Sequence, residues 1–307
     1  MKGHRIGIAL GSGSARGWSH IGVIEALQEA GIEPDIVCGT SFGALVGAAC
    51  VTQRLSELKN FAEALTWSGV VSLLDISLIR GGLIDGKHIV KLLQKLGIDV
   101  PIETCAKPFA AIATDLETGR EIWLREGSIA EAVRASITLP GILSPVHHGE
   151  RWLVDGGLVN PVPVSTCRAL GADVVIAVDL NGDIMGRRFK APPAQQPVTE
   201  TTAIPPEFLR GLLANVPPSL REQASAIAPK LFRSAPARPA YFDVLANSIN
   251  IMQDHITRSR LAGDPPDIIL VPRLGHIGLM EFHRATEAIS EGRACVDQAM
   301  SALRRYV

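Results

Sequence analysis

One stretch constrains this chain more than any other. A short apolar run, residues 35–38, leads into Gly39-Thr40-Ser41-Phe42-Gly43, and small residues follow at once. This order predicts a β-strand, a sharp turn with Ser41 at its apex and a tightly packed helix, which is the nucleophile elbow of acyl-transfer enzymes. The helix N-terminus behind Ser41 favours the negative charge that develops during acyl transfer. The alternative is a Gly-rich turn in which a hydroxyl side chain merely caps a helix.

A Gly/Ser-rich loop precedes this elbow. Residues 5–10 alternate and predict a first strand, the loop GSGSARG occupies residues 11–17, and residues 18–30 have helical spacing. Strand, loop, helix and then the elbow form a β-α-β-α opening, so we expect a parallel sheet with helices on its faces. Loops that follow neighbouring parallel strands open on the same edge of a sheet, so loop 11–17 is expected to lie close to Ser41.

The loop at 11–17 has three interpretations. Its backbone N–H groups can form the oxyanion hole that a serine nucleophile needs. A nucleotide-binding loop is a weaker interpretation, because its glycines match neither G-x-G-x-x-G nor a P-loop. In addition, Glu33 and Asp35 precede the second predicted strand, whereas a ribose-binding acid belongs at its far end. The third interpretation is a flexible turn without a chemical role.

A candidate base lies far downstream of the elbow. Residues 147–152 predict a hairpin, and the apolar strand that follows carries Asp155 into a Gly-Gly turn. An Asp-Gly pair alone is common in the turns of β-hairpins, but no strand of alternating polarity follows here to form the second half of a hairpin. Residues 162–170 favour a helix and residues 173–178 a core strand. A carboxylate can take the proton of a serine hydroxyl directly when burial places its pKa suitably.

Together these three motifs resemble one known family. Residues 11–17, 39–43 and 155–157 are similar, in order and spacing, to the patatin-like phospholipase family, and in particular to its bacterial RssA-like branch, related to the neuropathy-target-esterase group. The resemblance covers roughly residues 6–180, and the branch resemblance extends over residues 241–278. It implies a patatin-like three-layer α/β/α fold with a mostly parallel central sheet, and hydrolysis of a lipid or acyl ester without a cofactor or metal.

The resemblance also implies roles for individual residues. Ser41 would be the nucleophile and Asp155 its general base, in a dyad without histidine. The family's motif glycines correspond to Gly39, Gly43, Gly156 and Gly157. The backbone of the oxyanion hole corresponds to Gly13, Ser14, Ala15, Arg16 and Gly17. The family loop usually reads Gly-Gly-Gly-x-Arg/Lys-Gly, so Ser12 and Ser14 stand where glycines are expected, and a glycine-only conformation at either position would distort the hole. Arg16 keeps the basic position, and we expect it to anchor the loop.

A histidine-containing site is the rival hypothesis. The chain order Ser, Asp, His permits an α/β-hydrolase triad, because His255, His276 and His283 lie downstream of Asp155. We favour the dyad, since His255 falls inside a polar predicted helix and His276 follows a Pro/Gly turn. For His20, on the first predicted helix, we expect a packing or capping role.

Composition excludes other classes of function. The chain has 307 residues and a net charge of −1, so no overall field favours nucleic acid. Its five cysteines form no CxxC pair and no metal-ligand spacing, which predicts free thiols in a reducing compartment. No segment reaches the apolar length of about 18 residues that a membrane span needs. We therefore expect a cytoplasmic protein. A lipid substrate implies at least transient contact with a membrane surface, here the inner face, and homo-oligomer formation is left open.

The chain divides into three predicted parts. These are a catalytic core at 5–182, a Pro-rich insertion or linker at 187–238, and a C-terminal α/β extension at 239–307 packed on the core. We expect further helices at 55–67, 86–96, 129–137, 206–215, 219–228, 241–262 and 282–306, and further strands at 108–114, 120–124 and 267–271. Residues 69–84 could shield an acyl chain, although plain helix packing is favoured.

Two hypotheses about function follow from the sequence. The first is a serine acyl hydrolase of lipid esters, of the phospholipase, lysophospholipase or esterase type, that works through an acyl-enzyme. The second is a regulatory or scaffold protein on the same fold with weak or no hydrolysis, which the serines at 12 and 14 and the Pro-rich excursion favour.

Overall fold

The computed structural model describes residues 4–67, 69–70, 86–184 and 241–306. Its strands are β1 (Ile6–Leu10), β2 (Ile36–Thr40), β3 (Phe109–Asp115), β4 (Glu121–Leu124), β5 (Val146–His148), β6 (Arg151–Asp155), β7 (Val174–Val178) and β8 (Ile268–Leu270). Its helices are α1 (Ser19–Glu29), α2 (Phe42–Val51), α3 (Leu55–Glu63), α5 (Lys87–Lys95), α6 (Ile129–Ser136), α7 (Val164–Ala169), α10 (Tyr241–Gly263) and α11 (Ala285–Leu303).

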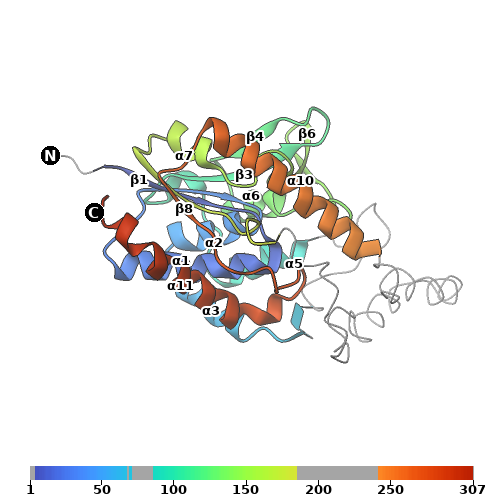
Figure 1. Cartoon of the computed structure of the whole chain (residues 1–307). Coiled ribbons are helices and arrows are strands. Elements are labelled where there is room, and N and C mark those ends of the chain that lie inside the picture. The colour runs from blue at the N-terminus through green and yellow to red at the C-terminus, as the bar shows by residue number, and fades with distance from the viewer. Residues whose placement is uncertain (1–3, 68, 71–85, 185–240, 307) are drawn as a thin grey trace, which may run out of the picture.

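All the strands belong to one eight-stranded sheet in the order β5-β6-β3-β2-β1-β7-β8, with β4 paired to β3. The stretch β3-β2-β1-β7-β8 is parallel, and β4, β5 and β6 are added antiparallel. Helices cover both faces: α7 and α10 lie on one side, and α1, α2, α3 and α11 on the other (Figure 1). The expected three-layer α/β/α fold with a mostly parallel sheet is confirmed.

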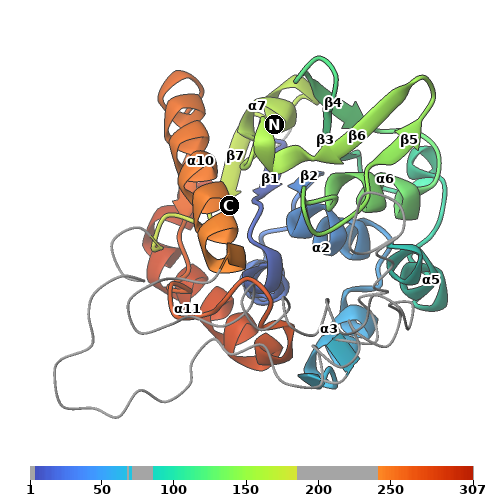
Figure 2. The same cartoon turned by 90° about the vertical axis from the view of Figure 1, so that its right-hand side faces the viewer.

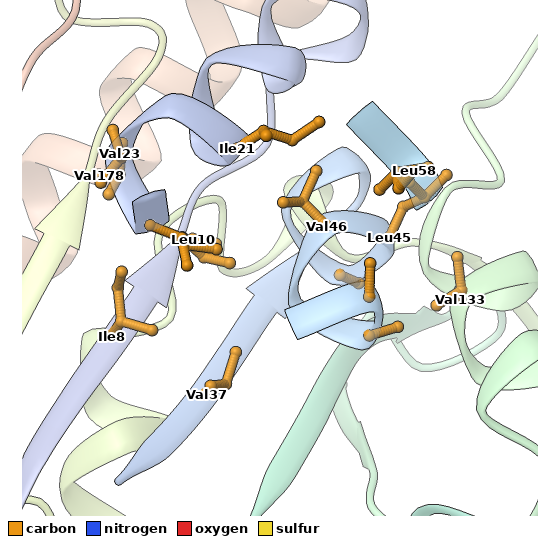
Figure 3. Close-up of a cluster of buried hydrophobic side chains, with 14 of the residues drawn as sticks. Ile8, Leu10, Ile21, Val23, Val37, Leu45, Val46, Leu58, Val133 and Val178 are labelled. Atoms are coloured by element: carbon orange, nitrogen blue, oxygen red, sulfur yellow. The ribbon is translucent and has the colours of Figure 1, made fainter. Parts of the chain in front are cut away.

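The central strands separate two apolar clusters. Every residue of β1 and β2 is buried, because helices cover both faces of the sheet. Alternate side chains therefore enter different clusters: Ile8, Leu10 and Val37 pack with α1 and α2 (Figure 3), whereas Ala9 and Cys38 belong to the smaller cluster beneath α7. This double cover explains why both strands read in the sequence as nearly continuous apolar runs.

The C-terminal segment is built into the same sheet. Strand β8 pairs in parallel with β7, with Ile176 opposite Ile268. Helix α11 lies along α1, on the face of the sheet that also carries α2 and α3 (Figures 1 and 2). Leu274, Ile277 and Val296 are fully buried in the larger core cluster together with residues of the N-terminal half.

Some predicted boundaries differ from the structure. The segment 11–17 was expected to be a loop, but Ser14–Trp18 form a short 3-10 helix that leads directly into α1. The helix expected over 55–67 ends at Glu63. Predictions for residues 71–84 and for 187–238, with its short helices, lie outside the described residues.

Candidate active site

Ser41 occupies the turn between β2 and α2 in a strained backbone conformation, with φ of 57° and ψ of −122°. L-residues rarely adopt this conformation, and it persists only where the surroundings enforce it. The flanking glycines allow the strand, turn and helix to approach closely. A Cβ added at Gly43 would lie 2.1 Å from the Leu10 carbonyl oxygen, and one at Gly39 would lie 2.4 Å from the Gly43 oxygen. No other residue type fits at these two positions without displacing the backbone.

Hydrogen bonds from neighbouring elements hold the turn. The Ser41 N–H donates to Oγ of Ser136 at 2.9 Å, and the Ser136 hydroxyl donates to the Ile112 carbonyl on β3 at 2.5 Å. On the other side, the Thr40 hydroxyl donates to the Asn160 carbonyl at 2.8 Å. Ser136 is a supporting residue that the sequence reasoning missed, because a single serine at the end of a helix carries no motif.

Asp155 lies directly against the serine. The Ser41 hydroxyl donates to Oδ2 of Asp155 at 2.6 Å, across a sequence separation of 114 residues. The other carboxylate oxygen, Oδ1, accepts the Gly157 N–H at 2.7 Å. Asp155 is 1% exposed. Burial raises its pKa to about 6, against the lowering effect of the bonds from Ser41 and Gly157. The carboxylate is thus ionised at neutral pH and a better proton acceptor than an exposed aspartate.

The predicted oxyanion loop lies beside Ser41, since Ser12, Gly13 and Ser14 line the same cavity as the serine. The ends of the loop are already hydrogen-bonded: the Ser12 N–H donates to the Pro161 carbonyl at 2.9 Å, and the Ala15 N–H donates to the Leu279 carbonyl at 3.1 Å. The N–H groups of Gly13 and Ser14 have no acceptor among the described residues.

These hydrogen bonds reduce the number of N–H groups in the predicted oxyanion loop that are free to bind a ligand. Five residues were expected, but the Ala15 N–H is engaged by Leu279 and the Arg16 N–H donates to the Gly13 carbonyl at 3.2 Å. Gly17 lies inside the 3-10 helix, packed against the ring of Phe42. Of these five residues, Gly13 and Ser14 line the cavity and have N–H groups without an acceptor among the described residues, because the chain enters a helix immediately after them.

The two serines that replace family glycines are accommodated differently. Ser14 has a φ of 52°, a left-handed conformation that serine reaches at a modest cost of about 1 kcal/mol. Ser12 does not have a positive φ. At the retained Gly13 the requirement is space, since an added Cβ would lie 2.8 Å from Cβ of Leu180. The loop therefore keeps glycine where a side chain would collide.

Arg16 is fully buried behind this loop. Its Nε donates to the Gly13 carbonyl at 3.1 Å, and its Nη2 donates to Oδ1 of Asn250 on α10 at 3.1 Å. The side chain thus connects the loop to a helix that is distant in sequence. The Gly13 carbonyl is thus engaged by Arg16, which fixes the peptide group between Gly13 and Ser14.

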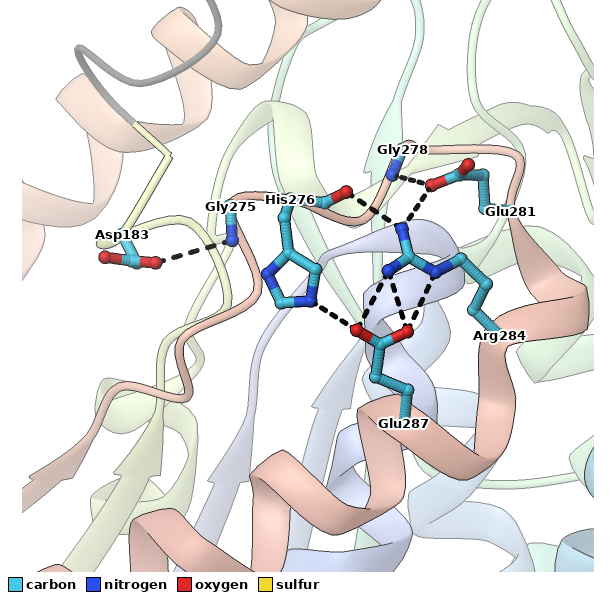
Figure 4. Close-up of polar contacts among 7 residues, drawn as sticks. All are labelled: Asp183, Gly275, His276, Gly278, Glu281, Arg284 and Glu287. Carbon is cyan, nitrogen blue, oxygen red and sulfur yellow. Dashed lines mark hydrogen bonds and ion pairs between the residues drawn. The ribbon is translucent and has the colours of Figure 1, made fainter. Parts of the chain in front are cut away.

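The segment from Gly275 to Arg284, near the C-terminus of the chain, forms part of the cavity lining. It is tied down by a polar cluster in which Arg284 donates to the His276 carbonyl and pairs with Glu281 and Glu287 (Figure 4). The Gly278 N–H also donates to Glu281 at 2.6 Å. Leu279, Met280 and Phe282 of this loop line the cavity.

The cavity itself is largely apolar. It is lined by Ser12, Gly13, Ser14, Ser41, Phe42, Ile89, Ile137, Leu139, Ile142, Leu143, Ile249, Asn250, Gln253, Leu279, Met280 and Phe282. A second cavity, lined only by apolar side chains, adjoins it and shares Phe42, Ile89, Ile137 and Phe282 with it. Together the two cavities form a largely apolar space that begins at Ser41 and extends to the residues of the second cavity.

None of the downstream histidines contacts Ser41 or Asp155 in the described structure. His255 is exposed on α10. His276 pairs with Glu287 at 2.7 Å on the surface (Figure 4), and the ring of His283 packs edge-on against Trp67. His20 is fully buried behind the loop, where its Nε2 lies 2.8 Å from the Gly11 carbonyl. Burial lowers the pKa of His20 to about 4, so the ring is neutral and donates this bond.

The described residues contain no group of three or more His, Cys, Asp or Glu side chains placed to hold a metal ion. All five cysteines are free. Within the same residues, no helix combines the length and apolar character needed to cross a membrane.

Comparison with known proteins identifies the family. The family model for patatin-like phospholipases matches residues 8–168, which include both Ser41 and Asp155. The chain belongs to the patatin-like phospholipase family. As expected for the neuropathy-target-esterase-related branch, it is 34% identical to an uncharacterized NTE family protein of Mycobacterium tuberculosis, over 97% of this chain and 92% of that protein.

Other members of the patatin-like phospholipase family match over smaller shares of their own length. A second uncharacterized NTE family protein of Mycobacterium tuberculosis is 32% identical over 98% of this chain and 47% of that protein. Patatin-like phospholipase domain-containing protein 6 of Mus musculus is 34% identical over 59% of this chain and 14% of its own length. Among solved structures, that of VipD from Legionella pneumophila aligns with 99% of this chain and 67% of its own, at 14% identity and a TM-score of 0.47. The family assignment rests on the sequence matches.

Proposed function

We propose that this protein is a serine hydrolase of lipid acyl esters, of the phospholipase, lysophospholipase or esterase type. The observation that carries the proposal is the 2.6 Å hydrogen bond from the Ser41 hydroxyl to the buried carboxylate of Asp155, at the wall of an apolar cavity. A hydroxyl paired with a base of raised pKa is the arrangement that activates a serine for nucleophilic attack. Membership of the patatin-like phospholipase family supports the same class of substrate.

In the acylation step, Asp155 takes the hydroxyl proton while Oγ of Ser41 attacks the carbonyl carbon of the ester. The negative charge moves to the carbonyl oxygen, where the N–H groups of Gly13 and Ser14 and the N-terminus of α2 stabilise it. Collapse of this intermediate breaks the ester C–O bond. Asp155 returns the proton to the leaving alcohol, and the acyl group remains on Ser41.

In the deacylation step, Asp155 accepts a proton from water, and the resulting hydroxide attacks the acyl-enzyme. The same N–H groups stabilise the second oxyanion, the bond from Ser41 to the acyl group breaks, and the proton returns to Oγ. The products are a carboxylic acid and the free enzyme, so the proposed steps balance in atoms and charge with the ester, water, Ser41 and Asp155 alone. The apolar walls hold the acyl chain throughout both steps.

A fluorophosphonate probe, which labels activated serines covalently, tests the proposal. We expect labelling of the wild type and loss of labelling in Ser41→Ala, with ester hydrolysis falling by about 10³-fold or more in both Ser41→Ala and Asp155→Asn. Ser259→Ala, an exposed serine on α10, is the matched control and should label like the wild type. Labelling that persists in Ser41→Ala would exclude Ser41 as the nucleophile.

A second candidate function is a regulatory or scaffold protein on this fold with weak or no turnover. The observation that favours it is the positive φ of Ser14. This serine stands where the family loop has a glycine, and its N–H is one of the proposed oxyanion donors. It predicts a folded wild-type protein that hydrolyses no acyl ester, from short-chain esters to phospholipids, and that the fluorophosphonate probe does not label.

A further inference from the structure

One side chain of the loop at 11–17 lines the cavity that contains Ser41 and has no role in the steps described so far. Ser12 stands where the family loop usually has a glycine, so its hydroxyl is an addition to the general family pattern. The residue is 4% exposed. Its hydroxyl makes no hydrogen bond with any described residue, and its Oγ keeps accessible surface. This hydroxyl is therefore available to a ligand in the cavity.

Backbone hydrogen bonds fix the position of this hydroxyl. The Gly11 N–H donates to the Val178 carbonyl at 3.0 Å, and the Ser12 N–H donates to the Pro161 carbonyl at 2.9 Å. Pro161 belongs to the segment that follows Asp155. Ser12 is thus bonded directly to the part of the chain that carries the proposed base.

The Ser12 hydroxyl and the Asp155 carboxylate lie around the same point. The position that a Cβ would take on Gly157 is 3.0 Å from Oγ of Ser12 and 2.9 Å from Oδ1 of Asp155, and Nε2 of Gln253 lies 2.3 Å from it. The two oxygens are therefore separated by no more than two hydrogen-bond lengths. No direct hydrogen bond joins them in the described part of the chain. One water molecule can bond to both oxygens.

The carboxylate has the capacity to bind such a water. Oδ1 accepts the Gly157 N–H at 2.7 Å, which uses only one of its lone pairs. Oδ2 accepts the Ser41 hydroxyl at 2.6 Å, and this bond is lost when the serine becomes acylated in the proposed reaction. Most of the remaining cavity lining is apolar, and a water in an apolar cavity is held only where it finds polar partners. Ser12 and Asp155 together supply two such partners.

We propose that Ser12 is a catalytic residue for deacylation, and that its hydroxyl binds the attacking water beside Asp155. This inference rests on the proposed acyl-hydrolase function. The water donates one hydrogen to Asp155 and the other to Oγ of Ser12, which leaves a lone pair of its oxygen directed at the acyl carbon. One proton moves to Asp155 as the new C–O bond forms. Cleavage of the bond between the acyl carbon and Oγ of Ser41 then returns this proton to Ser41, and Ser12 neither gains nor loses a proton.

Two substitutions remove the hydroxyl. Ser12→Ala keeps the Cβ and deletes only the oxygen, and Ser12→Gly restores the glycine of the family loop. Neither changes the backbone N–H groups of Gly13 and Ser14, the proposed oxyanion donors. Ser259→Ala, at an exposed position on α10, is the matched control.

The test combines steady-state kinetics on p-nitrophenyl butyrate with intact-mass spectrometry of the enzyme during turnover. The activated leaving group makes acylation fast, so that deacylation limits kcat, whereas kcat/KM depends only on the steps up to acylation. We expect kcat to fall about fivefold to tenfold in both Ser12 variants while kcat/KM stays within about twofold of the wild type, so that KM falls with kcat. The acylated fraction of the enzyme should rise in both variants and stay at the wild-type level in Ser259→Ala.

The possible outcomes are distinguishable. Equal falls in kcat and kcat/KM would show that the hydroxyl acts on the oxyanion loop, and wild-type kinetics in both variants would show that it has no part in the reaction. Either result overturns this inference and leaves the proposed function standing. A folded wild type that hydrolyses no acyl ester overturns the proposed function and, with it, the inference. If Ser12→Gly does not fold, as judged by circular dichroism, Ser12→Ala alone decides.

Discussion

At the residue scale, the site depends on the direct bond between Ser41 and Asp155. Without a histidine between them, the carboxylate itself must accept the serine proton in the proposed mechanism. An exposed aspartate has a pKa near 4 and is a weak base, whereas burial raises the pKa of Asp155 to about 6. The hydrogen bonds from Ser41 and Gly157 stabilise the ionised form and keep the carboxylate charged at neutral pH.

This pKa sets the expected pH dependence of activity. Only ionised Asp155 can act as a base, so kcat/KM should fall about tenfold per pH unit below a pKa near 6 and stay level above it up to pH 8. A histidine-dependent site would depend on His255, His276 or His283. Alanine variants of these three residues should keep the wild-type profile, measured with a short-chain ester between pH 4.5 and 8.5. Loss of activity in a folded variant of any one would contradict the dyad.

The same pKa shift has a consequence for stability. The folded protein binds the Asp155 proton more tightly than the unfolded chain does, so this residue lowers the free energy of unfolding as pH rises from about 4 to about 6. Asp155→Asn removes the buried charge and keeps an oxygen for the Gly157 N–H. We expect this variant to be more stable than the wild type at pH 8, by about 1 to 3 kcal/mol in urea unfolding. The difference should disappear at pH 4, and a variant that is less stable at both pH values would contradict the expectation.

At the scale of elements, the elbow is held where α6 meets β2 and β3. Ser136, the last residue of α6, receives the Ser41 N–H and donates to the Ile112 carbonyl, so its hydroxyl connects all three elements. Ser136→Ala leaves the Ser41 N–H without an acceptor. We expect a loss of about 1 to 3 kcal/mol in stability and a fall in kcat of about tenfold with little change in KM. Thermal unfolding and steady-state kinetics measure both effects, with Ser259→Ala as the control, and wild-type kinetics in Ser136→Ala would show that the elbow needs no support from α6.

The second apolar cavity gives a prediction about chain length. Leu65 lines this cavity but not the one that contains Ser41. Leu65→Trp should fill the space and shorten the accessible channel without disturbing the serine. We expect the ratio of kcat/KM for p-nitrophenyl palmitate to that for p-nitrophenyl butyrate to fall about tenfold. Leu116→Trp, at an exposed position, is the control, and an unchanged ratio in Leu65→Trp would show that the acyl chain does not enter this cavity.

At the scale of the whole molecule, the sequence predicted those features that depend on residues close together in the chain, namely the strands, the turns and the motif residues. The apolar runs before the loop and the elbow indicated parallel strands, and the motifs singled out Ser41 and Asp155, which the fold brings into contact. The pairing of loop N–H groups was not predictable, because their acceptors, Val178, Pro161 and Leu279, come from distant segments. Asn250 and Gln253 of α10, which line the cavity that contains Ser41, were missed for a related reason. Their amides carry no motif, and a polar stripe on an amphipathic helix usually indicates a face in contact with solvent.

The most extensive prediction concerns the C-terminal segment. Strand β8 covers the edge of β7, α11 packs along α1, and Ile277, Ile289 and Val296 are buried in the same core cluster as the N-terminal half. We therefore expect the whole chain to unfold in a single cooperative transition. A chain that ends at residue 184 should lose its fold, because its β7 edge and the apolar face of α1 would be exposed to water. A chain that ends at Arg304 keeps all of α11 and should behave like the full-length protein in circular dichroism and gel filtration. A folded, monomeric 1–184 fragment would show that the segment after 240 is an independent addition, and the cavity residues of α10 and of the 275–284 loop would then be separable from the part of the fold that carries Ser41 and Asp155.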